Sequence, residues 1–184
     1  MKRVIDVLIA LTALLALWPI MLIIAALIKI TTKGPVIYIQ SRVGLNEAIF
    51  QLYKFRSMVS DADKFGDYRT EINDSRITPI GRVLRKYSLD ELPQFFNILK
   101  GEMSVVGPRP DTPMQKERYD ESEWILRTSV KPGLTGLAQA TRRSLASHEE
   151  RIRLDLKYIE QQSLWLDLKI ILLTFTKLSG LGSN

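Results

Sequence analysis

Hydrophobic residues are concentrated in one run near the start of the chain, and shorter apolar and polar segments alternate after it. From Val7 to Ile28, a stretch of 22 residues, only Thr12 and Pro19 are not apolar. A helix on the surface of a soluble protein keeps a polar face, so a run without one predicts a membrane-embedded helix. Its 13 Leu, Ile and Val residues favour insertion by roughly −4 to −8 kcal/mol. A cleaved signal peptide fits less well, because Lys29 follows the run where small residues would mark a cleavage site.

Two features of this run bear on whether it crosses the bilayer. Pro19, preceded by Trp18, lies near its middle and has no backbone N–H, so the helix bends or breaks there. Basic residues, which favour the cytoplasmic side, flank the run at both ends, namely Lys2, Arg3, Lys29 and Lys33. A re-entrant helix-break-helix that dips into the membrane and returns fits these features, and a kinked spanning helix fits them about as well. Asp6, at the start of the run, is expected to pair with Lys2 or Arg3 one turn earlier.

Beyond Gly34-Pro35 the pattern predicts an α+β fold that is mostly helical. Short apolar segments at 36–40 and 49–55, on either side of a turn, predict a small β-hairpin. Proline and glycine predict fixed loops at 104–113 and 131–136. The acid-rich stretch 60–78 is expected to be a solvated loop or a frayed helix, because its carboxylates have no regular metal-loop spacing.

Amphipathic helices are expected in the remaining segments, where apolar residues recur at helical spacing between start and stop signals. These segments are 78–87, 88–99 and 148–162. The segment 164–175 is strongly apolar, but it is too short and too charged to span a bilayer. We expect it to be an interfacial helix in the headgroup plane, with Trp165 and Lys169 as anchors. A buried C-terminal helix is the alternative.

Composition narrows the chemistry that this chain can perform. Its 184 residues include no cysteine and one histidine, His148, so disulfides, zinc-thiolate sites, cysteine nucleophiles and two-histidine metal motifs are excluded. Any acid–base or metal chemistry therefore rests on carboxylates, Lys, Tyr or hydroxyl groups. The net charge of +6 makes nucleic acid, anionic lipid and phosphorylated substrates possible partners.

The most informative segment is 85–94, which reads Arg-Lys-Tyr-Ser-Leu-Asp-Glu-Leu-Pro-Gln. Ser88 and Glu91 match a capping box, and a purely structural cap is the simpler interpretation of the motif alone. Pro93, however, suits the first turn of a helix, which leaves Asp90 and Glu91 at or just before its N-terminus. A carboxylate in that position stays ionised and lies where phosphate binds.

This position suggests phosphoryl chemistry. Carboxylates are competent nucleophiles that form acyl-phosphates, which makes Asp90 a candidate nucleophile. Glu91 is a candidate ligand of Mg²⁺, because that ion prefers carboxylate and phosphate oxygens. Arg85 lies five residues before Asp90, and Arg109 lies between two prolines that restrict its backbone. Guanidinium groups bind two phosphate oxygens at once, so both arginines are candidate phosphate ligands.

The ordered motifs of the chain resemble the small monotopic phosphoglycosyl transferases of bacteria, the bacterial sugar transferase family. Besides Ser-Leu-Asp-Glu-Leu-Pro-Gln at 88–94, the resemblance rests on six motifs along nearly the whole chain. They are Lys2-Arg3-x-x-Asp6, Gln40-x-Arg42-x-Gly44, Lys54-Phe55-Arg56-Ser57-Met58, Asn97-x-Leu99-x-Gly101-x-Met103-Ser104, Gly107-Pro108-Arg109-Pro110, and Lys131-Pro132-Gly133-Leu134-Thr135-Gly136-Leu137-Ala138-Gln139.

The resemblance implies an activity and a location. Such enzymes transfer a sugar-1-phosphate from a UDP-sugar to a membrane polyprenyl phosphate such as undecaprenyl phosphate, and they release UMP. They use Mg²⁺ and a covalent phospho-sugar on the Asp of an Asp-Glu pair, which implies Asp90 as nucleophile and Glu91 as its partner at the metal. The resemblance also implies that Arg109 and Arg143 contact phosphates. It further implies that membrane lipid, but not nucleic acid, is a partner, and it leaves the oligomeric state open.

The implied organisation is a re-entrant membrane helix at 1–33 and a catalytic domain at 34–184 on the cytoplasmic face of the bacterial inner membrane. The chain is expected to be the minimal catalytic core, without the additional spanning helices of larger members. Two departures stand out. Trp18 occupies the position of a usual Ser before Pro19, and Thr141-Arg142-Arg143-Ser144 stands where a Gly commonly precedes the family's Arg.

Two other classes of function are weighed against the transferase. One is a Mg²⁺-dependent membrane hydrolase of nucleotide sugars or lipid phosphates that uses the same Asp90. The other is a non-catalytic membrane anchor for glycan assembly. The Asp-Glu-Leu-Pro element favours an enzyme over an anchor.

Overall fold

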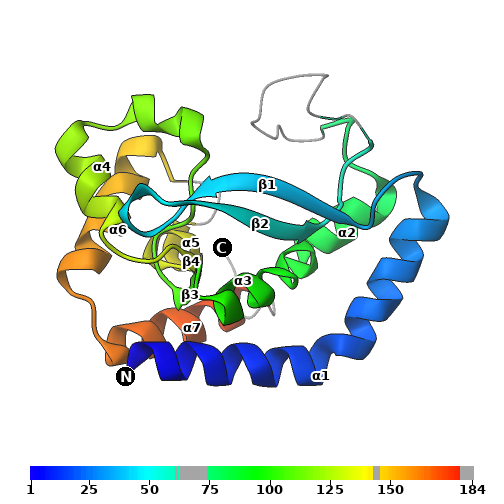
Figure 1. Ribbon diagram of the computed structural model, residues 1–184, viewed down its shortest axis with the longest axis horizontal. Helices are drawn as coiled ribbons and strands as arrows, with labels where there is room; N and C mark the ends of the chain where they lie inside the picture. Colours follow the sequence, from blue (N-terminus) through cyan, green and yellow to red (C-terminus); the bar gives the residue numbers. More distant parts are fainter. Residues whose placement is uncertain (61, 63–73, 143–145, 179–184) are drawn as a thin grey trace.

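A long bent helix forms one edge of the molecule in a computed structural model, which describes residues 1–60, 62, 74–142 and 146–178. Helix α1 (Lys2–Thr31) contains Pro19, and the helix remains continuous through it. Figure 1 shows that α1 changes direction near its middle, so the proline produces a bend and no non-helical break. Among the described residues, α1 is the one helix long and apolar enough to cross a membrane.

A two-stranded antiparallel hairpin crosses the middle of the molecule, as predicted (Figure 1). Strand β1 (Ile37–Val43) pairs with strand β2 (Ile49–Phe55), and the short turn η1 (Leu45–Glu47) joins them. Phe50 and Leu52 are buried and Gln51 is exposed, which is the alternation expected of a half-buried strand. Lys54 lies on the same face of β2 as Phe50 and Leu52, because it is two residues further along the strand.

Short helices and two very short strands make up the rest of the chain. In order they are α2 (Pro79–Lys86), η3 (Leu89–Glu91), α3 (Gln94–Lys100), β3 (Ser104–Val106), η4 (Pro113–Arg118), α4 (Glu121–Thr128), β4 (Gly133–Thr135), α5 (Leu137–Arg142), α6 (His148–Glu160) and α7 (Leu164–Leu178). The described chain is therefore mostly helical with a small antiparallel sheet, as expected, and β3 and β4 add a parallel pair.

Two predictions about local structure are wrong. The helix expected over 88–99 begins only at Gln94, because residues 89–91 form a separate 3₁₀ turn. This helix ends at Lys100 and is capped by Gly101, whose φ is +88°. The loops expected at 104–113 and 131–136 contain β3 and β4, which pair in parallel. Most of the acid-rich stretch lies outside the described residues, which leave out 61 and 63–73.

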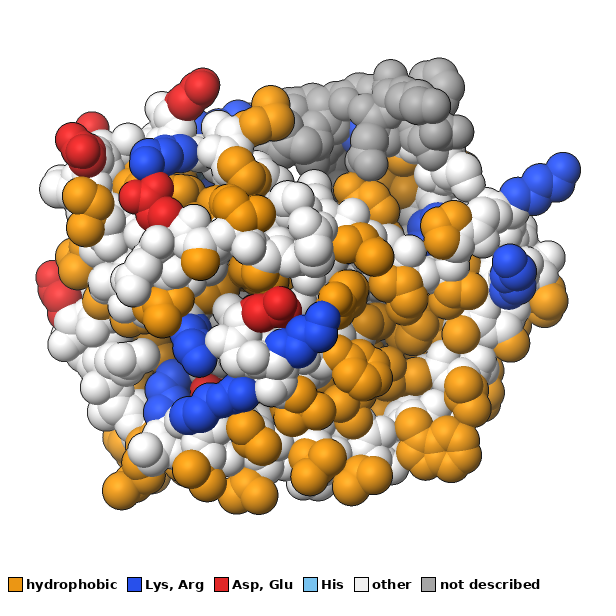
Figure 2. All heavy atoms as spheres, in the orientation of Figure 1, with side chains coloured by type: hydrophobic (Ala, Val, Ile, Leu, Met, Phe, Trp, Pro, Cys, Tyr) orange, Lys and Arg blue, Asp and Glu red, His pale blue; other side chains and the backbone are white. Residues whose placement is uncertain are grey.

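The two ends of α1 pack against different parts of the same body. Ala10 joins a core cluster with Phe50, Ile98 and Met103, whereas Ile24 and Ile28 join a second cluster with Phe55 and Leu84. Between them, residues 11–23 of α1 include no buried residue. The elbow of α1, defined as residues 11–23, therefore lies mostly outside the core, although Met21 packs against the second cluster, and Figure 2 shows apolar side chains along this edge.

Polar residues at the start of α1 attach it to the body, but not as predicted. The buried carboxylate of Asp6 accepts hydrogen bonds from Ser104 Oγ (3.0 Å) and Val105 N (2.9 Å) instead of pairing with its helical neighbours. Arg3 donates to the Leu99 carbonyl at the end of α3 (2.8 Å), and Lys2 pairs with Asp167 of α7. The expected local ion pairs are thus replaced by contacts with three other elements.

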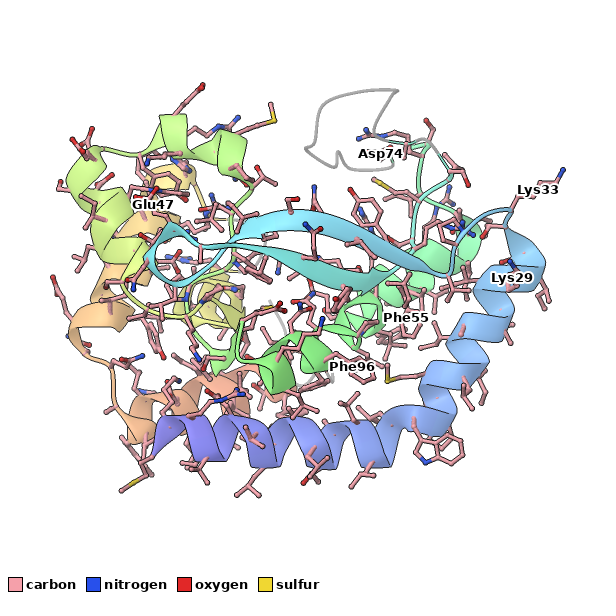
Figure 3. The ribbon with its side chains drawn as sticks, viewed as in Figure 1. Lys29, Lys33, Glu47, Phe55, Asp74 and Phe96 are labelled. Carbon is pink, nitrogen blue, oxygen red and sulfur yellow. The ribbon has the colours of Figure 1, made fainter. Side chains whose placement is uncertain are left out.

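The other end of α1 is held by the segment that follows β2. Arg56 Nη2 donates to Thr32 Oγ1 (2.6 Å) and to the Thr32 carbonyl (3.1 Å). Figure 3 shows Phe55 between α2 and the part of α1 that follows the bend, with Lys29 and Lys33 at the far end of this part. Both ends of α1 are therefore fixed to one body.

Helix α7 is amphipathic in the structure. One side buries Asp167 and Ile170, and the other exposes a stripe formed by Trp165, Leu168, Leu172 and Phe175. The alternative of a buried C-terminal helix is therefore wrong. The placement of the stripe in a lipid interface remains a prediction.

Candidate active site

A 3₁₀ turn between α2 and α3 presents the two acidic residues that the sequence singled out. Ser88 adopts a left-handed conformation (φ 55°) that ends the α2 segment, and η3 then carries Asp90 and Glu91. Leu89 and Leu92 pack partly buried against the cluster of Phe55 and Leu84, which holds the turn in place. The capping-box interpretation of Ser88 and Glu91 is wrong. The Ser88 side chain makes no capping hydrogen bond, and the Glu91 carboxylate accepts a hydrogen bond from Lys54.

Glu91 is a paired carboxylate. Its Oε1 accepts a hydrogen bond from Arg109 Nη2 (2.8 Å) and another from Lys54 Nζ (3.0 Å). Burial opposes its ionisation, but the charges and hydrogen bonds of Arg109 and Lys54 outweigh burial and hold the pKa of Glu91 well below its usual value. The lowered pKa favours the ionised form of Glu91, whose carboxylate pairs with two cations.

Asp90 differs from its neighbour, because no described residue donates a hydrogen bond to its carboxylate, although the residue is only 7% exposed. Burial and the adjacent charge of Glu91 raise the pKa of Asp90, whereas the charges of Lys54, Arg85 and Arg109 partly oppose that rise. A carboxylate whose lone pairs are not engaged is more available to attack an electrophile.

Cations surround this pair of acids. Arg85 of α2 donates from Nε to Ser57 Oγ (2.9 Å), and its charge acts on Asp90. Arg109 acts on both acids. The structure therefore brings together four of the predicted residues, Arg85, Asp90, Glu91 and Arg109. Arg143 lies outside the described residues.

Lys54 is a member of this site to which no sequence motif assigned a role, although the alternation of buried residues along its strand carries a signal. Strand alternation places Lys54 on the face that carries Phe50 and Leu52, and this face is buried. A lysine at a buried strand position needs an anionic partner, because burying a charge alone is costly. Glu91 is that partner. We define the catalytic cluster, named for the role proposed below, as Lys54, Arg85, Asp90, Glu91 and Arg109.

The donor set suits a metal ion that is shared with substrate. No group of three His, Asp or Glu side chains within residues 1–60, 62, 74–142 and 146–178 is placed to hold one. Mg²⁺ is commonly bound by one or two carboxylates together with substrate phosphates. Asp90 has free oxygens, and Glu91 Oε2 receives no hydrogen bond from the described residues. These carboxylates fit an ion held jointly with phosphate oxygens.

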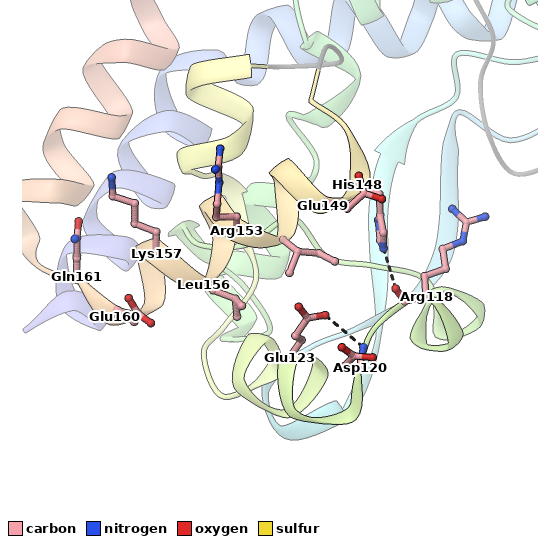
Figure 4. Close-up of a pocket in the computed structure, with 11 residues that line it drawn as sticks. Arg118, Asp120, Glu123, His148, Glu149, Arg153, Leu156, Lys157, Glu160 and Gln161 are labelled. Atoms are coloured by element: carbon pink, nitrogen blue, oxygen red, sulfur yellow. Dashed lines mark hydrogen bonds between the residues drawn. The ribbon is translucent and has the colours of Figure 1, made fainter.

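A groove of the described structure lies away from the catalytic cluster. It has a volume of about 760 Å³ and lies between α6 and the segment of η4 and α4 (Figure 4). Its lining mixes acids and bases, and it contains none of the catalytic cluster. His148 lies at its edge, where Nε2 is 3.0 Å from the Arg118 carbonyl oxygen.

Comparison with known proteins now adds to this geometry. The model of the family described as "Bacterial sugar transferase" matches residues 1–180. The chain belongs to the bacterial sugar transferase family. The resemblance drawn from the motifs is confirmed, and the catalytic cluster lies within the matched region.

Three curated relatives of this bacterial sugar transferase illustrate the similarity. A UDP-glucose:undecaprenyl-phosphate glucose-1-phosphate transferase of Klebsiella pneumoniae is 45% identical over 96% of this chain and 39% of its own length. A transferase with the same name from Caulobacter vibrioides is 42% identical over 96% of this chain and 69% of its own length. The exopolysaccharide production protein ExoY of Sinorhizobium fredii is 41% identical over 94% of this chain and 83% of its own length. The chain thus spans well under half of the Klebsiella relative.

Proposed function

We propose that this chain is a phosphoglycosyl transferase that moves a sugar-1-phosphate from a UDP-sugar to a membrane polyprenyl phosphate and releases UMP. The observation that carries the proposal is the buried carboxylate of Asp90, which receives no hydrogen bond from the described residues and lies among three cations beside the ion-paired Glu91. The names of the relatives, which state UDP-glucose and undecaprenyl phosphate, support this choice of substrates for the chain.

The proposed reaction has two displacement steps at one phosphorus atom. In the first, an Asp90 oxygen attacks the phosphorus that carries the sugar, the bond to the UMP oxygen breaks, and UMP leaves. In the second, a phosphate oxygen of the polyprenyl phosphate attacks the same phosphorus, and the bond to Asp90 breaks. The product is a polyprenyl diphosphate sugar, and Asp90 is restored as a carboxylate.

The other members of the cluster have distinct proposed roles. Arg109 and Arg85 offer guanidinium groups to phosphate oxygens, and Lys54 holds Glu91 in place. Bound Mg²⁺ would neutralise charge between the carboxylates and the phosphates. Because Glu91 is already paired with two cations, Asp90 is the acid with oxygens free for covalent chemistry.

We also propose that α1 is re-entrant and that the catalytic body lies on the cytoplasmic face of the membrane. The attachment of both ends of α1 to one body supports this, because a straight span would carry its ends to opposite sides. Since the chain has no cysteine, single cysteines placed just before Met1 and at Lys33 can be probed with an impermeant thiol reagent. Neither should react in intact cells and both should react after lysis; reaction of one alone in intact cells contradicts the re-entrant topology.

The activity is tested by UMP release from a panel of UDP-sugars, with and without undecaprenyl phosphate. A transferase releases UMP catalytically only when the acceptor is present. Sustained UMP release without the acceptor would favour a hydrolase instead. No release with any UDP-sugar, together with full glycan assembly in cells that carry Asp90→Ala, would favour a non-catalytic anchor.

A further inference from the structure

The segment that carries Arg109 is held at every backbone carbonyl. We define the arch as residues 108–111. The Pro108 carbonyl accepts from Gly133 N (2.8 Å), and the Asp111 carbonyl accepts from Val43 N (2.9 Å). The two carbonyls between them accept from arginine side chains, Arg109 O from Arg127 Nη2 (2.6 Å) and Pro110 O from Arg42 Nη1 (2.8 Å). Prolines 108 and 110 fix two further backbone angles.

Arg127, from the last turn of α4, is the centre of a second group of charges. Its Nη1 pairs with Asp111 Oδ2 (2.6 Å), and its Nε and Nη2 donate to Asp155 Oδ2 of α6 (3.1 and 3.0 Å). Tyr119 OH also donates to Asp111 Oδ2 (2.6 Å). We define the support cluster as Asp111, Tyr119, Arg127 and Asp155.

Arg127 therefore lies behind Arg109 while the Arg109 side chain faces Glu91. The Arg127 side chain is only 4% exposed, whereas the side chain of Arg109 is 40% exposed, so Arg109 is the arginine of this pair that a ligand can reach from solvent. A guanidinium has five N–H groups in a fixed plane, and here it serves two carboxylates and one carbonyl at once. An ammonium group has no such planar fork.

We propose that Arg127 is a positioning residue that sets the orientation of the Arg109 guanidinium toward substrate phosphate, through the hydrogen bond to the Arg109 carbonyl. This inference rests on the proposed function, because it concerns how that site binds a nucleoside diphosphate sugar. Arg42 has a parallel role at the next carbonyl. Burial and the charge of Arg109 lower the pKa of Arg42 to about 10, which agrees with its close approach to the arch.

A double-mutant cycle separates positioning from general stabilisation. The four proteins are the wild type, Arg127→Lys, Arg109→Lys and the double variant, each of full length. We expect Arg127→Lys to lower kcat/KM for the UDP-sugar about tenfold, because small displacements of a binding group are costly. In the Arg109→Lys background the same change should cost less than about twofold, since the group it positions has already been altered. The proposal would be overturned if the loss of kcat/KM in the double variant equals the product of the losses in the two single variants. It would also be overturned if Arg127→Lys has wild-type activity.

Arg151→Lys is the matched control. Arg151 approaches Asp111 Oδ1 at 3.7 Å and Tyr119 OH at 3.4 Å, and no hydrogen bond joins its side chain to an arch carbonyl. It should keep kcat/KM within about twofold of the wild type. A loss as large as that of Arg127→Lys would assign the effect to the support cluster in general and overturn the specific role of Arg127.

A second variant and a binding measurement complete the test of Arg127. If Arg127→Lys does not fold, Asp155→Asn, which loosens Arg127 without removing it, is taken through the same cycle with the same criterion. Calorimetric binding of UDP to the four proteins repeats the cycle without turnover. Wild-type protein that neither binds UDP nor transfers sugar phosphate contradicts the proposed function, whereas a wild type that does both, with an additive cycle, contradicts only this inference.

Discussion

The catalytic cluster and the support cluster each contain two carboxylates and at least one arginine, but they differ in whether each carboxylate has an ion-pair partner. In the support cluster, Arg127 pairs with both Asp111 and Asp155. In the catalytic cluster, Lys54 and Arg109 pair with Glu91 alone, and Asp90 receives no hydrogen bond from the described residues. Asp155 Oδ1 has no hydrogen-bond partner in the described structure, but Asp155 Oδ2 is held by Arg127, whereas neither oxygen of Asp90 is held. A buried carboxylate held by an ion pair specifies structure, whereas an unpaired one is where chemistry is expected.

The largest predicted effect comes from Asp90→Asn, which removes the unpaired carboxylate of the catalytic cluster. Because an amide is a poor nucleophile, the rate of UMP release should fall by at least about 10³-fold. Membrane binding should be retained and the melting temperature should not fall, because no contact of the Asp90 carboxylate holds the fold. Turnover within about tenfold of the wild type would show that Asp90 is not the nucleophile.

Neutralising one arginine in each cluster should separate stability from activity. Arg127→Met removes the nearest cation from two buried carboxylates, Asp111 and Asp155, so the free energy of unfolding should fall by about 3–5 kcal/mol. Arg109→Met removes a partly exposed partner of Glu91 and should cost no more than about 1 kcal/mol. Urea unfolding in a fixed detergent measures both. Equal losses for the two variants would remove the distinction between the clusters.

Glu91→Gln tests the paired acid of the catalytic cluster. The amide oxygen can still accept from Arg109 or Lys54, but the negative charge that holds both cations is lost. We expect kcat/KM to fall by roughly 10²-fold, less than for Asp90→Asn, with a higher Mg²⁺ concentration needed for half-maximal rate. Titration of the rate with MgCl₂ measures the second effect. A loss equal to that of Asp90→Asn, with an unchanged Mg²⁺ requirement, would contradict the proposed division of roles.

The smallest predicted effect is a pH-dependent difference in stability. Since burial and Glu91 raise the pKa of Asp90, its ionised form destabilises the folded state relative to the unfolded state. This penalty is present above the raised pKa and disappears as the pH falls below the usual pKa of an Asp, where the carboxyl is protonated in both states. Asp90→Asn should therefore be more stable than the wild type at pH 8, with the difference shrinking toward pH 4. An advantage that instead grows on acidification would contradict the direction of the shift.

Much of the fold follows from the sequence, because local patterns determine it. The apolar run and Pro19 predict the bent helix α1, and strand alternation predicts the hairpin. The helix at 78–87 begins as Thr78-Pro79 suggests, with Thr78 Oγ1 accepting from Gly81 N. The β3–β4 pair is missed because each strand has three residues, which is too short for a periodic signal.

The candidate site is only partly predictable for a related reason. Asp90, Glu91, Arg85 and Arg109 are found because motifs mark them, and the structure brings them together. The partners predicted for Asp6 are wrong, because its carboxylate makes tertiary hydrogen bonds to Ser104 and Val105 instead of pairing with neighbours in the helix. The roles of Lys54 and Arg127 depend on partners 37 and 28 positions away in the chain, at Glu91 and Asp155, and spacing does not reveal such partners.

The central claim, that Asp90 carries the phospho-sugar, is tested most directly by mass spectrometry of the protein after incubation with a UDP-sugar and Mg²⁺ without acceptor. We expect the intact mass to rise by one sugar-phosphate, with the modification on the peptide containing Asp90 and lost when undecaprenyl phosphate is added. The Asp90→Asn protein should remain unmodified. A sugar-phosphate on any other residue, or turnover with acceptor through no modified form at all, would contradict the claim.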